Sequence, residues 1–441
     1  MKHKVILFLF FVTSIIYAQN DVYVFKDIKN EYSIHTIESA NFKRIEKSIS
    51  DKDINASFWF KIPANKTVEN YIFRINSIRI KASSAFQNQK EIEKIANERY
   101  LAYKFNRISP VYIKVSSDFS SYFPFDLSTE NDSVFREKVQ IIMNSFYYGF
   151  TFLVIIYSFF YYYFFRDKAF LYSGLLISSL TLGFFLLDGM FHFFKFNNQT
   201  VEAITLLNYI FLAFFSSKFV HSFLLLDDYY PKLKKYTYSL GVLIIINVML
   251  FLIYRTNFLF VCLNILVFTI LLIYWFTGVI LFKNNIYTKI FVFAYATLLF
   301  TGIDFLVLKN FGIQIFESNP QNMKIGGLIQ IIVISLAVLY REKTLRKSNQ
   351  FMKIEIIKYS KEIEQMEFSI NDETQKEILQ TLTVREKEIF DLIIAGNSNK
   401  LIADSLNISV NTVKFHVKNI YEKLHIKSRK EAITLDKSFN L

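Results

Sequence analysis

The sequence predicts a multidomain membrane protein: an exported β-sandwich, a seven-helix transmembrane bundle, a coiled-coil linker and an all-α helix-turn-helix domain, in that order. Three observations predict it. Short runs of alternating apolar and polar residues occupy the first third of the chain. Apolar segments follow residue 140, each close to the length of about 20 residues that a helix needs to cross a bilayer. The last sixty residues carry the caps and apolar stripes of several short helices.

The composition narrows the classes of function. The 441 residues include 50 Phe and 27 Tyr, more aromatic residues than a soluble domain needs, and 441 residues are enough for about three domains. The formal charge of +13 fits contact with nucleic acid or with anionic lipid and does not choose between them. A single cysteine, Cys262, excludes a disulfide framework and a cysteine metal site, and the six histidines are scattered. We therefore expect no metal and no cofactor.

The first residues resemble a targeting segment. Residues 1–18 have a basic start, an apolar middle and a small residue, Ala18, before a polar stretch. This pattern predicts a secretory signal peptide, and the alternative is an uncleaved anchor helix. Either interpretation places the domain that follows on the exported side.

Seven apolar segments predict seven membrane spans. They cover residues 141–164, 169–191, 203–226, 236–254, 258–282, 287–309 and 324–340. The predicted inner loops and the stretch after the last span hold eleven basic residues, against four in the predicted outer loops. This bias follows the positive-inside rule and predicts a cytoplasmic C-terminus.

The exported domain, residues 19–138, is expected to be a sandwich of two sheets. Runs typical of half-buried strands are SFWFKI, YIFRINSIRIKA, YLAYKF and VYIKVSS, and the segment QKEIEKIANE is a candidate helical interruption. Together with the seven spans at residues 139–341, this order resembles the bacterial seven-transmembrane receptors with diverse intracellular signalling modules. The resemblance implies a small exported ligand, with carbohydrate as one candidate class. Trp59, Phe60 and Tyr71 are candidates for a sugar platform; their alternative role is in the core of the sandwich.

Three ionisable residues are expected within or beside the spans. Asp188 and Asp304 fall near the exported ends of their spans, and His192 lies one turn beyond Asp188. Ionisable groups are costly in a bilayer, so these residues are candidates for a ligand or intramembrane site in a shared cavity. The alternative is hydration at the interface, with long side chains reaching water.

The linker, residues 342–377, shows a heptad pattern. Its two interleaved series are Leu345, Met352, Tyr359 and Met366, and Asn349, Ile356, Ile363 and Ile370. Isoleucine in one series with a single asparagine favours a parallel two-stranded coiled coil, and therefore a homodimer. The alternative is a single amphipathic helix on the inner leaflet, although its mixed charges are not typical of lipid binding.

The C-terminal segment, residues 378–441, predicts four short helices. Thr383 with Glu386 forms a capping box, and Ser398, Ser409 and Ser428 are expected to cap the next three helices. Gly396 and Asn407 are expected at the turns. In the second helix, Leu401, Ile402 and Leu406 are expected to face the core.

This segment resembles the LuxR-type helix-turn-helix family along its whole length. The matching stretches are LTxREKEI, GxSNKxIAxxLxIS, NTVKxHVxNIxxKL and SRxEAI. The resemblance implies that the third helix enters the major groove of double-stranded DNA. It implies base contacts by Lys414, Phe415 and Lys418. We expect phosphate contacts from Lys400, Thr412, Asn419, Lys423 and Arg429. Between Lys400 and Lys430 there are seven basic residues against two acidic residues, which favours binding to phosphate.

These features predict a membrane-bound, one-component transcriptional regulator in the inner (cytoplasmic) membrane of a bacterium. The first alternative is a seven-transmembrane receptor that signals through protein–protein contacts of its C-terminal module, and the exposed lysines of the third helix argue against it. The second is an intramembrane enzyme built on Asp188, His192 and Asp304. The sequence shows no kinase boxes, nucleotide loop or catalytic triad, so we expect no enzymatic activity.

Overall fold

The computed structural model describes residues 21–46, 48–51, 56–117, 121–283, 285–313, 315–316 and 318–437, with the side chains of 121, 367–379 and 434–437 excepted. The predicted signal peptide, residues 1–18, lies outside the described residues. The chain divides into two compact units, Met1–Lys343 and Thr344–Leu441. The first unit contains the sandwich and the membrane spans.

The N-terminal part is a sandwich of antiparallel sheets, as predicted. One sheet has the strand order β2-β1-β4-β9-β6-β7 and the other the order β3-β10-β5-β8. The strands are β1 (Val22–Asp27), β2 (Lys43–Ile45), β3 (Ser48–Asp51), β4 (Ser57–Ile62), β5 (Asn70–Ile75), β6 (Ile80–Gln87), β7 (Lys90–Ile92), β8 (Leu101–Asn106), β9 (Val111–Ser117) and β10 (Ser121–Thr129). The short helix η1 (Ile37–Ser39) lies between β1 and β2.

Aromatic side chains from both sheets form the sandwich core. Phe60 of β4 meets Phe73 of β5 with ring centroids 5.2 Å apart and Phe125 of β10 at 5.7 Å. Phe58 of β4 meets Phe123 of β10 at 5.2 Å. Alternation along each strand places these rings on the inner faces, where each aromatic pair adds to the stability gained by burial.

Two local predictions in the sandwich need correction. The run at residues 71–82 forms two strands in different sheets, because the chain turns at Asn76–Arg79 between β5 and β6. Residues 89–98, a candidate helix, contain β7 and turns instead. Pairing of β7 with β6 satisfies the backbone groups there, and this pairing overrides the local helical pattern.

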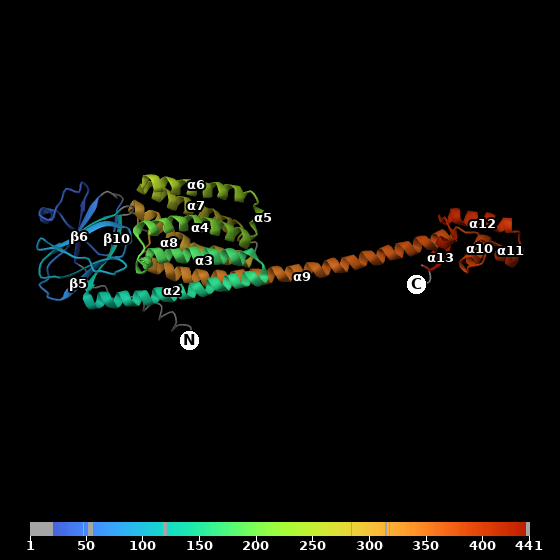
Figure 1. Cartoon of the computed structure of the whole chain (residues 1–441), viewed down its shortest axis with the longest axis horizontal. Helices are drawn as coiled ribbons and strands as arrows, with labels where there is room; N and C mark the ends of the chain where they lie inside the picture. The colour runs from blue at the N-terminus through green and yellow to red at the C-terminus, as the bar shows by residue number, and fades with distance from the viewer. Residues whose placement is uncertain are drawn as a thin grey trace. The chain divides into compact units, whose positions relative to one another are not determined.

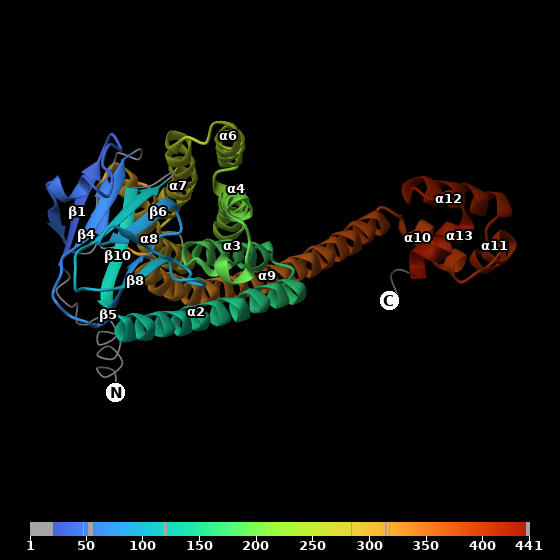
Figure 2. The same ribbon diagram turned by 60° about the vertical axis from the view of Figure 1, so that its left-hand side comes forward.

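Seven helices are long and apolar enough to cross a membrane, as predicted. The helices that begin in the first unit are α2 (Glu130–Phe165), α3 (Lys168–Leu187), α4 (Asn198–Leu224), α5 (Leu226–Tyr229), α6 (Leu233–Tyr254), α7 (Asn257–Ile280), α8 (Ile286–Leu306) and α9 (Pro320–Gln380), with the short helices η2 (Met190–Phe194) and η3 (Leu308–Phe311). All except α5 and η2 provide spans, and the sixth span continues from α8 through η3 to Phe311. Figures 1 and 2 show the sandwich at one end of these helices.

Helix α2 joins the sandwich to the bundle. It begins beside β5 and continues along the bundle (Figure 2). At its start, Glu130 accepts hydrogen bonds from Lys104 at 2.7 Å and from Asn70 at 3.3 Å. The Arg74 guanidinium donates to the Ser133 hydroxyl at 3.0 Å. The sandwich therefore rests on the first turns of a membrane span.

The predicted coiled coil lies on one continuous helix, because α9 includes both the last span and the linker. Its predicted seam is exposed in the single chain: Ile356 is 67% exposed and Ile363 57% exposed. The second unit then adds α10 (Val384–Ile394), α11 (Asn399–Leu406), α12 (Val410–Lys423) and α13 (Arg429–Lys437). Pairing of the linker remains a prediction.

Candidate functional site

Capping residues define the helices of the C-terminal unit, as predicted. The Thr383 hydroxyl accepts from the Glu386 amide at 3.3 Å, and the Glu386 carboxylate accepts from the Thr383 amide at 2.9 Å. The Ser398 and Ser409 hydroxyls cap α11 and α12 by accepting from the amides of Leu401 and Thr412. Asn407, at φ 56°, makes the tight turn between these two helices. These caps fix where α12 begins, and therefore which of its residues face outward.

The core of this unit holds α12 against α10 and α11. Its fully buried members are Ile389, Ile393, Ile402, Val413, Ile420 and Ala432. One prediction is wrong: Leu401 is 57% exposed, and Ala403 occupies the core position instead. Helix α11 has only eight residues, and packing against its neighbours places Ile402 and Ala403, but not Leu401, on its inner face.

The outer face of α12 carries the three expected base-contact residues. Lys414 and Lys418 are exposed one turn apart, and Phe415 is 62% exposed. Lys418 lies 3.7 Å from Glu422, an exposed pair one turn apart that contributes little stability. Phe415 gives this face an apolar surface between two cations that a partner can cover. The arrangement suits a groove that offers acceptors and methyl groups.

The five expected phosphate-contact residues fall into two groups. Lys400 and Thr412 are exposed and Asn419 is half-buried, with the Thr412 hydroxyl 2.7 Å from that of Ser409. Lys423 instead donates to the Glu386 carboxylate at 2.6 Å. Hydrogen bonds from Lys423 and Thr383 hold the pKa of Glu386 at about 2, so this pair stays charged at neutral pH.

Arg429 also serves the fold. Its guanidinium donates to the Asn399 side chain at 3.2 Å and to the Asn397 carbonyl. The interaction joins the start of α13 to the start of α11. Sequence reasoning missed the internal roles of Lys423 and Arg429, because their partners lie 37 and 32 residues away along the chain.

In the membrane part, Asp188 is a buried ion-pair partner. It is the C-cap of α3, is fully buried, and accepts from the Lys324 ammonium of α9 at 2.7 Å. The Tyr148 hydroxyl donates to the same carboxylate, and Asn144 accepts from Lys324. Each charge therefore has an opposite charge and further hydrogen bonds, which is the condition for burying both.

The sandwich reaches this cluster through Arg99. Its guanidinium binds Glu137 of α2 at 2.7 Å and donates to the Asp188 carbonyl at 2.9 Å. Beside it, Gly189 has φ 67°, and a Cβ there would lie 2.9 Å from the Arg99 carbonyl oxygen. Only glycine permits this approach of the sandwich loop to the end of α3.

A second ion pair lies at the other end of α3. Its N-cap, Asp167, pairs with Arg341 of α9. Arg341 also donates to the carbonyls of Phe223, at 2.8 Å, and Ser222, at 2.7 Å, near the end of α4. Helix α3 thus offers a carboxylate at each end, and α9 offers a cation to each. Lys324 and Arg341 are 17 residues apart, roughly 25 Å along a helix at 1.5 Å per residue.

Asp304 serves a different site from Asp188. Its carboxylate accepts from the amides of Ile315, at 2.8 Å, and Phe316, at 3.2 Å, and from the Ser318 hydroxyl. It therefore orders the loop between α8 and α9. The prediction of a cavity shared by Asp188, His192 and Asp304 is wrong, because His192 is the only one of these three residues that lines the large cavity of the first unit.

The aromatic side chains of the suggested sugar platform do not form one surface. Trp59 is 1% exposed and packs with Ile37 and Tyr112 on the outer face of its sheet. Phe60 lies in the core between the sheets, and Tyr71 belongs to the other sheet. The alternative, a role in packing, holds for Trp59 and Phe60 because strand alternation turns them to opposite, covered faces.

Two family models match the chain. Residues 140–341 match the 7TM diverse intracellular signalling family, and residues 380–435 match the bacterial regulatory proteins of the luxR family. The chain joins a seven-transmembrane signalling domain to a LuxR-family domain. The luxR-family match includes α10, α11 and α12. The exposed face of α12 therefore belongs to the LuxR-family domain.

Curated relatives are similar over the LuxR-family domain. The HTH-type transcriptional regulator MalT of Vibrio campbellii is 42% identical over 66 residues, which is 14% of this chain and 7% of the relative. The monoamine regulon transcriptional regulator of Klebsiella aerogenes is 41% identical over 71 residues, 16% of this chain and 31% of the relative. The chain thus spans less than a third of the length of either relative.

The buried pair between Asp188 and Lys324 predicts a large coupling energy. Asp188→Asn alone should cost about 3–5 kcal/mol, because it leaves the Lys324 ammonium buried without an opposite charge. The double variant Asp188→Leu with Lys324→Met should recover much of this loss. The measurement is a double-mutant cycle on the thermal unfolding of the full chain in detergent. The exposed pair Lys104–Glu130, also at 2.7 Å, is the control and should show a much smaller coupling. Equal coupling for both pairs would contradict this assignment.

Proposed function

We propose that the protein is a membrane-bound, one-component transcriptional regulator. The observation that carries this proposal is a LuxR-family domain in one chain with a seven-transmembrane signalling domain, with α12 exposing Lys414, Phe415 and Lys418. The regulators named among the relatives support DNA as the partner of this domain. The chain needs no separate messenger between the membrane and the promoter.

In this proposal α12 enters the major groove. Lys414 and Lys418 donate to guanine O6 and N7, and Phe415 contacts a thymine methyl group. Lys400, Thr412 and Asn419 contact phosphates. Lys423 and Arg429 contribute positive potential to the same region while keeping their internal partners. A phosphate contact by Lys423 would compete with its 2.6 Å pairing to Glu386.

The proposed location is the inner membrane of a bacterium, with the sandwich exported and the LuxR-family domain in the cytoplasm. DNA is in the cytoplasm, and seven spans between the two domains place them on opposite sides. The sandwich receives the signal at the outer surface, and the ion pairs of α9 connect that side to the linker.

We also propose that the linker pairs two copies of the chain. Its exposed apolar series at Met352, Ile356, Tyr359 and Ile363 supports a seam that a second helix would cover. Two recognition helices held together would read two half-sites, which raises affinity without new contacts.

The DNA-binding prediction separates base contacts from phosphate contacts. Lys414→Ala in a fragment of residues 344–441 should cost about 1–3 kcal/mol on the selected DNA sequence and relax specificity at one base pair. Lys400→Ala should weaken binding to every sequence and lower the slope of log K against log salt by about one. Titrations on duplexes selected from a random library, and on scrambled ones, measure both effects.

The control for this titration is Lys387→Ala, which changes an exposed lysine of α10 outside the proposed interface. It should leave specific binding unchanged. Binding that none of the three substitutions alters would argue against DNA recognition by α12. It would favour a receptor that signals through protein contacts.

The topology prediction uses reporter fusions. Fusions after Lys235 and after Tyr340 should be active with a cytoplasmic reporter, and a fusion after Asn197 should be active with an exported reporter. The reason is that Asn197 caps α4, whose first residue lines the same cavity as Arg79 of the sandwich. Lys235 follows the far end of α4, and Tyr340 precedes Arg341, which pairs with the start of α3. A cytoplasmic signal from the Asn197 fusion would contradict the proposed orientation.

The linker prediction uses matched cysteines in a Cys262→Ser background. Ile356→Cys, on the seam, should form a disulfide between two copies in oxidised membranes, whereas Ile354→Cys should not. Both positions are exposed to a similar degree, at 67% and 66%, so reactivity alone does not distinguish them. Gel electrophoresis without reductant measures the yield. Equal yields at the two positions would contradict a parallel two-stranded seam.

A further inference from the structure

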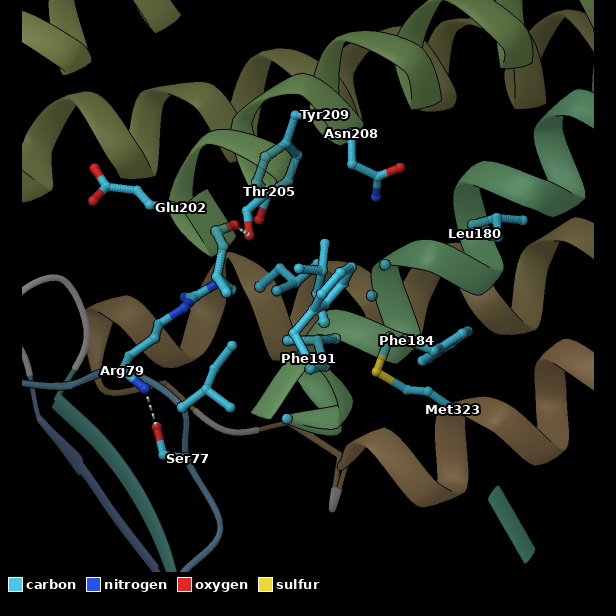
Figure 3. Close-up of a pocket in the computed structure, with 18 of the residues that line it drawn as sticks. Ser77, Arg79, Leu180, Phe184, Phe191, Glu202, Thr205, Asn208, Tyr209 and Met323 are labelled. Carbon is cyan, nitrogen blue, oxygen red and sulfur yellow. Dashed lines mark hydrogen bonds between the residues drawn. The ribbon is translucent and has the colours of Figure 1, made fainter. Parts of the chain in front are cut away.

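A cavity of about 740 Å³ lies within the first unit, between the sandwich and the membrane helices. Its lining comes from the loops around β6 and β8 and from α3, α4, α7, α8 and α9. This volume falls within the range of small-molecule sites, roughly 300–1,000 Å³. Figure 3 shows its residues converging from sandwich and helices. A ligand there would touch both the exported domain and α9.

The wall of this cavity within the helices is mainly apolar. Leu180 and Phe184 line it from α3, Met323 from α9, and Phe191 from the segment after α3. Farther along α7 and α8, Trp275 and Tyr295 also line it. Such a wall binds an apolar chain or ring through burial of surface.

The end of the cavity next to the sandwich carries a cation, Arg79. It lies in the turn before β6, and its guanidinium carbon is 4.5 Å from the Phe260 ring centroid. Figure 3 shows it extending towards α4, where Thr205 and Tyr209 lie. Among the described residues it forms no ion pair with a carboxylate. A partly buried guanidinium without a carboxylate partner is suited to bind an anion.

Unsatisfied polar groups also line the cavity. Asn208 is 7% exposed; its carbonyl oxygen accepts from Ser179 at 2.9 Å, and its amide nitrogen, which faces the cavity in Figure 3, has no hydrogen bond to the described residues. One carboxylate oxygen of Glu202 is buried and has no partner there either. Buried polar groups normally have partners, so an acceptor atom of a bound molecule would complete the Asn208 amide, and a headgroup that also carries a hydroxyl would complete Glu202.

The charges at the end of the cavity next to the sandwich favour binding of an anion. The basic lining residues are Arg79, Lys81, Lys94 and Arg99, and the acidic ones are Glu98 and Glu202. Glu98 already pairs with Arg74 at 3.0 Å, and Arg99 with Glu137 at 2.7 Å. Leaving Lys81 aside as well, Arg79 and Lys94 against Glu202 give this end a net positive charge.

We propose that this cavity binds an amphiphile that has an anionic headgroup and an apolar chain. The headgroup binds Arg79, and the chain lies among Leu180, Phe184 and Trp275. This inference rests on the proposed function and deepens it, since it gives the receptor a class of signal. The ligand would connect Arg79 of the sandwich with Met323, which neighbours Lys324 on α9.

The test is photolabelling of the full chain in nanodiscs of phosphatidylcholine. The probes are palmitate with a diazirine in its chain, hexadecanol with the same chain, and phosphatidylglycerol with a diazirine acyl chain. Labelled peptides are identified by mass spectrometry. Palmitate or phosphatidylglycerol should label segments around Leu180 and Phe184, and excess unlabelled ligand should compete. The probe that labels identifies a free fatty acid or a lipid as the source.

Arg79→Gln should lower labelling by the anionic probe about tenfold, because a charged hydrogen bond is lost, and should leave hexadecanol labelling unchanged. The matched control is Arg255→Gln, an arginine at the end of α6 outside the cavity. Leu180→Trp, which fills the cavity, should lower labelling by all probes. Gel filtration of each variant checks that it is folded.

Equal anionic labelling of the wild type and Arg79→Gln would overturn the proposal. Labelling confined to outward positions, such as Ile253 and Phe293, would also overturn it. DNA binding by residues 344–441 is measured separately, so failure of DNA recognition and failure of ligand binding give different results.

Discussion

The first unit depends on two buried ion pairs between α3 and α9. Asp188 and Asp167 cap the two ends of α3, and Lys324 and Arg341 of α9 pair with them. The cations are separated by roughly 25 Å of helix, comparable with a hydrocarbon core of about 30 Å. The two pairs are therefore far enough apart to lie near the two edges of a bilayer, and together they fix α9 along its length and about its axis. Loss of either partner would leave a charge in a region where solvation is poor.

This anchoring gives the sandwich a mechanical route to the linker. Arg99 of the sandwich donates to the backbone of Asp188, whose carboxylate holds Lys324. A change in the sandwich can therefore change the free energy of one end of α9. Because α9 continues into the linker as one helix, a small shift or rotation of that end can reach the linker. Coupling of this kind requires two states of α9 that differ in these contacts.

In the LuxR-family domain, basic residues divide between the fold and the outer surface. Lys423 and Arg429 hold α12 and α13 to the rest of the domain, whereas Lys414 and Lys418 point away from it. The internal pairs orient α12, and its outward residues remain accessible to a partner. A count of basic residues does not reveal this division, although it does indicate an anionic partner.

The sequence by itself determined the features that rest on local physics. Apolar length placed the seven spans, side-chain alternation placed most strands, and the caps at Thr383, Ser398 and Ser409 set the helices of the C-terminal unit. Tertiary structure decided which distant groups meet. It paired Asp188 with Lys324, assigned Asp304 to a loop, and buried Ala403 in place of Leu401. Such partners lie many residues apart, and the free energy that selects them comes from desolvation and packing in three dimensions, which no local pattern encodes.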